Sequence, residues 1–339
     1  MKVNDFDYDL PSQLIAQKPL KNRSDSRLMV INKSTEKISD IKFNEILYHL
    51  SSNDVLVINN TKVIPARLIG YKKSGAKIEI FLLKKIEENI WECLVKPGKR
   101  LKKDQNVYFE NDLNAKLLNI KDNGNRVLKF ECEKNFEQIL NEIGEAPLPP
   151  YIKEKLENID RYQTVYAKKG ESVAAPTAGL HFTDELLKKI KQKGIDIIEI
   201  NLEVGLGTFR PIKSENILEH EMHEEKFEIT KENAQKINDY KKNGKKIIAV
   251  GTTSLRALES SCDENKYLIG QKSETNIFIY PGYEFKIVDG LITNFHLPKS
   301  TLLLLVCAFS NKNLIMKAYE KAIKEQYRFF SFGDAMFLR

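Results

Sequence analysis

The sequence predicts an α/β fold that carries a small all-β insertion. Strand and helix patterns alternate over residues 183–327, as is typical of an α/β domain with a partly parallel sheet. Residues 63–149 contain only short strand patterns separated by turns, which indicates a small antiparallel barrel or sandwich. A buried-strand pattern already stands at residues 54–58, before this block. The all-β block therefore interrupts the α/β part of the chain.

Length and composition are those of a globular protein. The 339 residues suffice for two domains, or for one domain with a large insertion. The acidic start has no apolar signal segment. The longest apolar run, residues 302–309, is far shorter than the ~20 residues that a membrane helix needs. The four cysteines are scattered, which argues against a disulfide framework or zinc ribbon. We expect a cytoplasmic protein without membrane association.

The inserted block is bounded by two breaks in the pattern. The strand at 54–58 runs into the polar residues 59–62, and the block ends at the rigid sequence 147–150, which contains three prolines. Between them, Gly124 lies in a hairpin turn formed by residues 122–125. The predicted strands of the block are 77–83, 91–95, 106–109, 114–120 and 127–132.

The block after residue 150 alternates helices and strands. Thr183 is the expected N-cap of its first helix and Gly194 the expected terminator. Asp289 and Gly290 form an expected hairpin turn between two strands. The predicted helices are 183–193, 231–243, 255–260, 301–309 and 314–327, and the predicted strands are 195–204, 245–250, 278–280, 285–288 and 291–295.

A polar run at residues 161–182 is the first candidate ligand site. Small residues let a backbone pass close to a ligand, and mixed polar groups orient that ligand. The alternative is an ordinary polar connection between elements. The polar members are Arg161, Gln163, Thr164, Ser172, Thr177 and His181, set around Pro176 and Gly179.

Polar clusters also follow two predicted strands, where α/β sheets place ligands. Strand 195–204 is followed by Gly205, Gly207, Thr208 and Arg210. Glycines allow close approach of a ligand, and an arginine can bind a carboxylate or phosphate with two hydrogen bonds. Strand 245–250 is followed by Thr252, Thr253 and Arg256 at a helix start, a typical anion site. The alternatives are a simple turn and simple N-capping.

Four of the five histidines lie in these polar segments: His181, His220, His223 and His296. His220 and His223 are three residues apart, which permits a metal site, but the usual third ligand and the zinc spacing are absent. We expect no metal. Acid/base catalysis or ligand hydrogen bonding fits an imidazole with a pKa near ~6.5 better. The alternative for each is a hydrogen-bonded scaffold residue.

A basic turn in the inserted block is a candidate nucleic-acid contact. Residues 96–103 hold five cations and no acid, among them Lys99, Arg100, Lys102 and Lys103. The alternative is a solvated hairpin tip. The net charge of +7 permits a nucleic-acid partner without requiring one. The chain lacks the P-loop, the dinucleotide-binding glycine pattern and the G-x-S-x-G elbow, which disfavours those enzyme classes.

Taken together, the motifs resemble those of one family, the S-adenosylmethionine:tRNA ribosyltransferase-isomerases of queuosine biosynthesis. The resemblance spans nearly the whole chain, and its most specific segment reads Ala-Ala-Pro-Thr-Ala-Gly-Leu-His-Phe at 174–182. The matching segments are residues 6–11, 14–17, 59–67, 147–152, 162–166, 174–182, 204–209, 250–254, 293–298 and 327–336.

The resemblance implies an architecture and a reaction. The expected fold is a discontinuous, barrel-like α/β catalytic domain formed by residues 1–62 and 150–339, with a small antiparallel β-barrel domain at 63–149. The family transfers and isomerises the ribosyl group of S-adenosylmethionine onto 7-aminomethyl-7-deazaguanine at the tRNA wobble position. The products are epoxyqueuosine-tRNA, adenine and methionine. S-adenosylmethionine is then a consumed substrate, no cofactor is expected, and tRNA is the partner of a monomeric transferase.

The resemblance also assigns residues to the chemistry. Successive proton transfers suit imidazoles, so the four histidines are the candidate catalytic residues. Arg161, Arg210 or Arg256 is expected to hold the methionine carboxylate, and Tyr162 or Tyr166 to face the sulfonium. The basic turn is expected to hold the tRNA backbone. The expected substrate-binding residues are Arg161, Tyr162, Gln163, Thr177, Gly205, Gly207, Thr208, Arg210, Thr252, Thr253 and Arg256.

One position departs from the family pattern. Many members carry histidine where this chain has Glu203. A carboxylate then replaces that imidazole, or the position supports the site without acting in it. Two other functions stay open at this point: a tRNA-binding module without catalysis, and an unusual RNA methyltransferase that uses S-adenosylmethionine.

Overall fold

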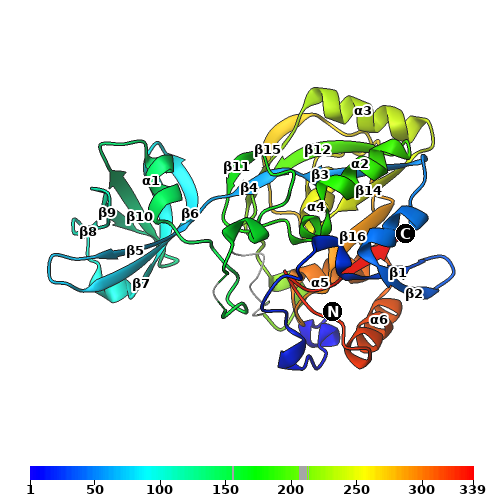
Figure 1. The fold of residues 1–339 in the computed structure, drawn as a ribbon, viewed down its shortest axis with the longest axis horizontal. Helices are drawn as coiled ribbons and strands as arrows, with labels where there is room; N and C mark the ends of the chain where they lie inside the picture. The colour runs from blue at the N-terminus through cyan, green and yellow to red at the C-terminus, as the bar shows by residue number, and fades with distance from the viewer. Residues whose placement is uncertain (155, 206–211, 213) are drawn as a thin grey trace. The chain divides into compact units, whose positions relative to one another are not determined.

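The computed structural model describes residues 1–154, 156–205, 212 and 214–339, and the chain divides into two units (Figure 1). The larger unit comprises Met1–Thr61, Pro150–Gly170 and Ala175–Arg339. The smaller unit comprises Lys62–Pro149 and Glu171–Ala174. A short two-stranded sheet pairs β4 (Thr61–Val63) with β11 (Lys169–Ser172).

A nine-stranded mixed sheet forms the centre of the larger unit, in the order β15-β13-β12-β3-β14-β16-β17-β1-β2. Strands β12, β3, β14 and β16 run parallel to their neighbours in this group, so their carboxyl ends share one edge. Both faces of β3 and β16 are buried, which explains the continuous apolar run at residues 55–58 of β3. The bounds are β1 Arg27–Ile31, β2 Ile38–Lys42, β3 Asp54–Asn59, β12 Asp196–Leu202, β13 Glu225–Ile229, β14 Lys246–Val250, β15 Gln271–Thr275, β16 Gly290–Asn294 and β17 Ala335–Leu338.

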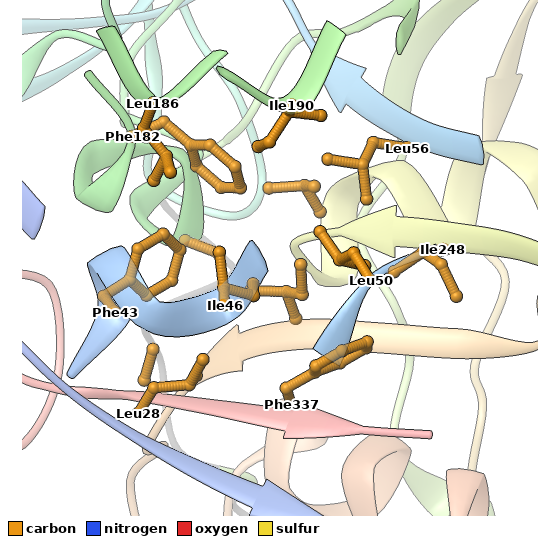
Figure 2. Close-up of a cluster of buried hydrophobic side chains, with 14 of the residues drawn as sticks. Leu28, Phe43, Ile46, Leu50, Leu56, Phe182, Leu186, Ile190, Ile248 and Phe337 are labelled. Carbon is orange, nitrogen blue, oxygen red and sulfur yellow. The ribbon is translucent and has the colours of Figure 1, made fainter. Parts of the chain in front are cut away.

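Helices pack on this sheet and close a hydrophobic core. Figure 2 shows Phe182, Leu186 and Ile190 pointing toward Phe43 and Ile46, all of them buried. Their apolar spacing and the N-cap of α2, where the Thr183 hydroxyl accepts a hydrogen bond from the Leu186 N–H at 3.1 Å, follow the pattern expected from the sequence. The helices are α2 Asp184–Gln192, α3 Lys231–Lys242, α4 Thr252–Ser260, α5 Thr301–Phe309 and α6 Lys312–Lys324.

The smaller unit contains a closed antiparallel barrel of six strands, in the order β10-β7-β6-β5-β8-β9. Alternate residues of its strands are buried, as small barrels require. Gly124 has a φ of +83° in the turn between β9 and β10, a conformation that favours glycine. The bounds are β5 Arg67–Tyr71, β6 Lys77–Glu87, β7 Ile90–Lys96, β8 Asn106–Tyr108, β9 Asn114–Ile120 and β10 Arg126–Glu131, followed by α1 Phe136–Ile143. The prediction of an α/β fold with an inserted β-barrel is confirmed.

Two predicted strands are wrong. Residues 278–280 and 285–288 are not strands, and residue 289 does not close a hairpin. For residues 285–288 the reason lies in Glu259, a buried residue of α4. Its carboxylate accepts hydrogen bonds from the backbone N–H groups of Lys286, Ile287 and Val288 at 2.9, 3.2 and 3.1 Å. A side chain therefore satisfies the donors that a neighbouring strand would otherwise bind.

In the part of the chain that the structure describes, no single helix has the length and apolar character needed to cross a membrane. Helices α5 and α6 pass such a test only as a pair, and they are bent by 117° at the break between them.

Candidate active site

A pocket of the larger unit lies where the parallel strands end. Residues that follow β12, β14 and β16 line it, together with the segment before α2. Its empty space amounts to about 600 Å³ when the part open to solvent is included. Gly251, with a φ of +88°, makes the turn from β14 into α4. The polar lining residues are Tyr151, Thr177, Thr252, Thr253, Thr293, Asn294, His296, Ser300 and Ser331.

The side-chain hydroxyl of Thr253 is a possible ligand contact in this pocket. Its side chain is buried, and Oγ1 has no hydrogen-bond partner among the residues that the structure describes. An unpaired buried hydroxyl is costly, and native proteins rarely keep one without a ligand or a water. Its position at the pocket wall therefore favours a bound ligand with a polar group.

His296 is the histidine that lines this pocket. Its Nε2 lies 2.8 Å from Oγ1 of Thr293, its backbone N–H donates to the Tyr319 hydroxyl at 2.9 Å, and its carbonyl accepts from the Tyr8 hydroxyl. Burial lowers the pKa of His296 to about 3. The imidazole is therefore neutral at physiological pH, which is the form that can accept a proton.

His181 does not line this pocket, but it contacts Asn294, which does. Its Nε2 lies 3.0 Å from Nδ2 of Asn294, and its Nδ1 lies 2.7 Å from Oγ of Ser26. The ring stacks on Phe43 with centroids 4.9 Å apart. Burial, followed by the charges of Arg328 and Arg23, lowers the pKa of His181 to about 3. His181 also lines a smaller pocket beside Arg23 and Arg161.

His223 belongs to an ionic cluster next to Gly205. Its Nε2 lies 3.3 Å from Oε1 of Glu225, which also accepts the Gly205 N–H at 3.0 Å, and Oε2 of Glu225 pairs with Nη1 of Arg256. Burial disfavours the Glu225 carboxylate, but the charge of Arg256 and the contact with His223 outweigh it and lower its pKa to about 2. Glu225 and Arg256 are both buried, so a substrate carboxylate would have to share Arg256 with Glu225.

His220 lies apart from these hydrogen bonds, with its ring edge-to-face on Phe278 at 5.4 Å between centroids. Burial and, next, His223 lower the pKa of His220. Among the described residues, no three His, Cys, Asp or Glu side chains are grouped so as to hold a metal ion.

The polar run at 161–182 divides between the two pockets and the interior. Thr177 lines the larger pocket and Arg161 the smaller one. The Arg161 guanidinium donates to the carbonyls of Leu20 and Lys21 at 2.7 and 3.1 Å. Tyr162 and Tyr166 are buried, and Gln163 lines neither pocket. Gly207, Thr208 and Arg210 lie outside the described residues.

The basic turn lies in the smaller unit. Lys99 and Arg100 end the short 3₁₀ helix Gly98–Arg100, and Lys102 and Lys103 follow it. All four side chains are exposed. Among the described residues none of the four has an ion-pair partner, so their charges are free to meet an anionic ligand.

Five polar residues of the larger pocket were not predicted as site residues from the sequence: Tyr151, Thr293, Asn294, Ser300 and Ser331. Tyr151 and Ser331, 180 residues apart, share a hydrogen bond of 2.7 Å. Asn294 ends β16 just before His296, so its place at a strand end was the available signal. Tyr151 and Ser331 follow no strand, and only the folded chain brings them to the pocket.

Comparison with known proteins places the chain in a family. The model of a family described as queuosine biosynthesis protein matches residues 3–338. The chain belongs to this family. It is 58% identical over 338 residues to the S-adenosylmethionine:tRNA ribosyltransferase-isomerase of Fusobacterium nucleatum, covering 99% of this chain and 96% of that one. The enzyme of the same name from Halothermothrix orenii is 56% identical over 340 residues, covering 100% of both chains.

A solved structure agrees with these relatives. The crystal structure of S-adenosylmethionine tRNA ribosyltransferase from Thermotoga maritima matches with a TM-score of 0.56 and 40% identity, and the match covers 99% of this chain and 100% of that one. The queuosine family resemblance found in the sequence motifs is confirmed.

Proposed function

We propose that this protein is an enzyme that transfers and isomerises the ribosyl group of S-adenosylmethionine onto 7-aminomethyl-7-deazaguanine at the tRNA wobble position. The products are epoxyqueuosine-tRNA, adenine and methionine. Full-length identity of 53–58% to enzymes of that name carries the proposal. The pocket at the strand ends supplies a place for the nucleoside.

The pocket chemistry suits this reaction. The sulfonium of S-adenosylmethionine acidifies the adjacent ribose 5′ carbon, so a neutral base can remove a proton there. We propose His296 as that base, because its imidazole lines the pocket. Departing adenine then takes up a proton, the neutral amine of the tRNA base attacks, and closure of the epoxide expels methionine. Thr252 and Thr253 offer hydroxyls to the nucleoside.

The tRNA contact is proposed at the basic turn. Lys99, Arg100, Lys102 and Lys103 are exposed cations that suit phosphate groups. The modified base must leave the anticodon loop to reach a pocket, as enzymes that act on bases generally require. We also propose a monomer that works in the cytoplasm, where both substrates are found; the four free cysteines fit such a reducing compartment.

The test is an assay of products. The protein is incubated with S-adenosylmethionine and tRNA that carries the deazaguanine precursor, and adenine, methionine and S-adenosylhomocysteine are measured. Adenine and methionine without S-adenosylhomocysteine support the proposal. S-adenosylhomocysteine would indicate a methyltransferase, and tRNA binding without any product would indicate a binding module. Either result would reject the proposed reaction.

A further inference from the structure

A series of hydrogen bonds links four residues at the larger pocket, and the donor and acceptor of each bond can be derived from the structure. This series runs from Ser26 through His181 and Asn294 to Thr177. Ser26, His181 and Asn294 are buried. Thr177 and Asn294 both line the pocket, and Thr177 is partly exposed. The direction of each bond follows from which atoms can only accept.

The Asn294 amide has one possible orientation. Its Nδ2 lies 3.1 Å from the carbonyl oxygen of Phe330 and 3.4 Å from that of Asp334. Rotation of the amide by 180° would set Oδ1 against two carbonyl oxygens, which cannot donate. Nδ2 therefore faces these carbonyls and His181, and Oδ1 faces Thr177.

This orientation determines the state of His181. An amide nitrogen only donates, so Nε2 of His181 must accept and carry no proton. Its proton then sits on Nδ1 and is donated to Oγ of Ser26 at 2.7 Å, while the Ser26 hydroxyl points to the Arg23 carbonyl at 3.4 Å. Both nitrogens of His181 are thus occupied. The low pKa of about 3 that burial gives His181 agrees with this neutral tautomer.

The same orientation determines the hydroxyl of Thr177. Oδ1 of Asn294 only accepts, so the Thr177 hydroxyl donates its single proton to it at 3.1 Å. The lone pairs of Oγ1 remain for the pocket. A ligand group beside Thr177 is stabilised only if it carries a proton to donate.

We propose that Thr177 accepts a hydrogen bond from an N–H or O–H group of the nucleoside substrate, and that Asn294 and His181 are positioning residues that impose this polarity. His181 then orients the site and exchanges no proton with the substrate, in place of the catalytic role expected from the sequence. The inference rests on the proposed function, because its assay uses S-adenosylmethionine as the ligand.

The first test reads the protonation state of His181 directly and needs no enzyme assay. In protein with ¹⁵N-labelled histidine at pH 7, NMR should show one imidazole with protonated Nδ1 and bare Nε2 that disappears in the His181→Gln variant. A proton on Nε2 of that ring would overturn the proposal. This measurement does not depend on turnover, so it can fail while adenine release succeeds, and the reverse.

The second test compares Thr177→Val with its matched control, Thr177→Ser. The valine variant should raise KM for S-adenosylmethionine about 10-fold in the adenine-release assay, the loss of roughly one hydrogen bond. The serine variant keeps the hydroxyl and should stay near the wild-type KM. Equal KM values in the valine variant and the wild type would overturn the proposal, whereas absence of adenine from the wild type would reject the proposed function instead.

The donor group is identified with an analogue whose adenine 6-amino group is dimethylated. If that amino group donates to Thr177, the ratio of KM between Thr177→Val and wild type falls to about one with the analogue. If a ribose hydroxyl donates, the ratio stays near its value with S-adenosylmethionine.

Discussion

The larger unit contains two polar clusters that are built in opposite ways. The network of Ser26, His181, Asn294 and Thr177 is neutral throughout, and its hydrogen-bond directions follow from carbonyl groups of the backbone. The cluster of His223, Glu225 and Arg256 contains a buried ion pair. A neutral network costs little to bury and sets the direction of each bond, whereas a buried ion pair depends on the presence of both charges. The two clusters should therefore respond differently to substitution, pH and salt.

The largest expected effect is on catalysis at the neutral pocket. His296→Asn should lower kcat for adenine release by about 100- to 10,000-fold, because the base is lost while the shape is nearly kept. Steady-state kinetics at saturating tRNA measure this. His49→Asn is the matched control, since His49 lines neither pocket. A kcat within a few-fold of wild type would remove His296 from the mechanism.

The ionic cluster should show its effect in stability. Glu225→Ala leaves the Arg256 charge buried without its partner, which should lower the free energy of unfolding by about 3–5 kcal/mol. Chemical denaturation measures the change. Glu228→Ala, which removes a half-exposed partner of Lys169, should cost less than about 1 kcal/mol. Similar losses in both variants would contradict the role given to the buried pair.

Acid should act on the two buried histidines, His181 and His296, and on the ionic cluster over different pH ranges. The folded pKa values of His181 and His296, about 3, lie below the ordinary 6.5, so the unfolded chain takes up these protons first as pH falls. The two neutral imidazoles therefore contribute fully to the free energy of unfolding above pH 6.5. This contribution is lost as the pH falls toward 3, at about 1.4 kcal/mol per pH unit for each imidazole. Glu225 has a folded pKa of about 2, below the ordinary value of 4.5. Its carboxylate therefore stabilises the folded state above pH 4.5, and this stabilisation is lost only as the pH falls below 4.5.

Denaturation midpoints at pH 7, 6 and 5 test this order of titration. The loss of stability between pH 6 and 5 should be smaller in His296→Asn than in wild type and unchanged in Glu228→Ala. A wild-type stability that stays constant over this range would show that the two imidazoles are not buried in neutral form.

The smallest effect is expected from exposed charge. Replacing the four cations of the basic turn by glutamine should weaken tRNA binding and reduce the slope of log affinity against log salt by about 3 units, close to one per lost phosphate contact. Binding is measured from 50 to 300 mM salt. The control replaces Lys188, Lys231, Lys242 and Lys317, which are exposed on helices of the larger unit. Equal slopes in both variants would exclude the turn as the tRNA contact.

Local sequence was sufficient to predict segments whose structure depends on residues within the segment itself. The apolar run at 54–58, the Thr183 cap and the Gly124 turn all appear in the structure at the expected places. Segments whose pairing is supplied from far away were misjudged or missed. Residues 285–288 have a strand pattern, but Glu259 binds their N–H groups. β15 is a polar edge strand that no apolar alternation reveals.

The candidate site divides in the same way. Thr177, Thr252, Thr253 and His296 follow strand ends or helix starts, where sequence reasoning looks for ligands, and all line one pocket. Arg256 and His223 were equally good candidates by sequence, yet Glu225 pairs with both. The sequence around Arg256 does not indicate that Glu225 is its partner. The two residues are 31 positions apart and meet only when α4 packs beside β13.

The sequence by itself determined the α/β class, the inserted barrel and the family, because these rest on local periodicity and on ordered motifs. Only the tertiary structure decided which polar residues face a pocket and in which protonation state. Hydrogen-bond direction depends on acceptors such as the carbonyls of Phe330 and Asp334, which lie 36 and 40 residues after Asn294 in the sequence and meet it only in the folded chain.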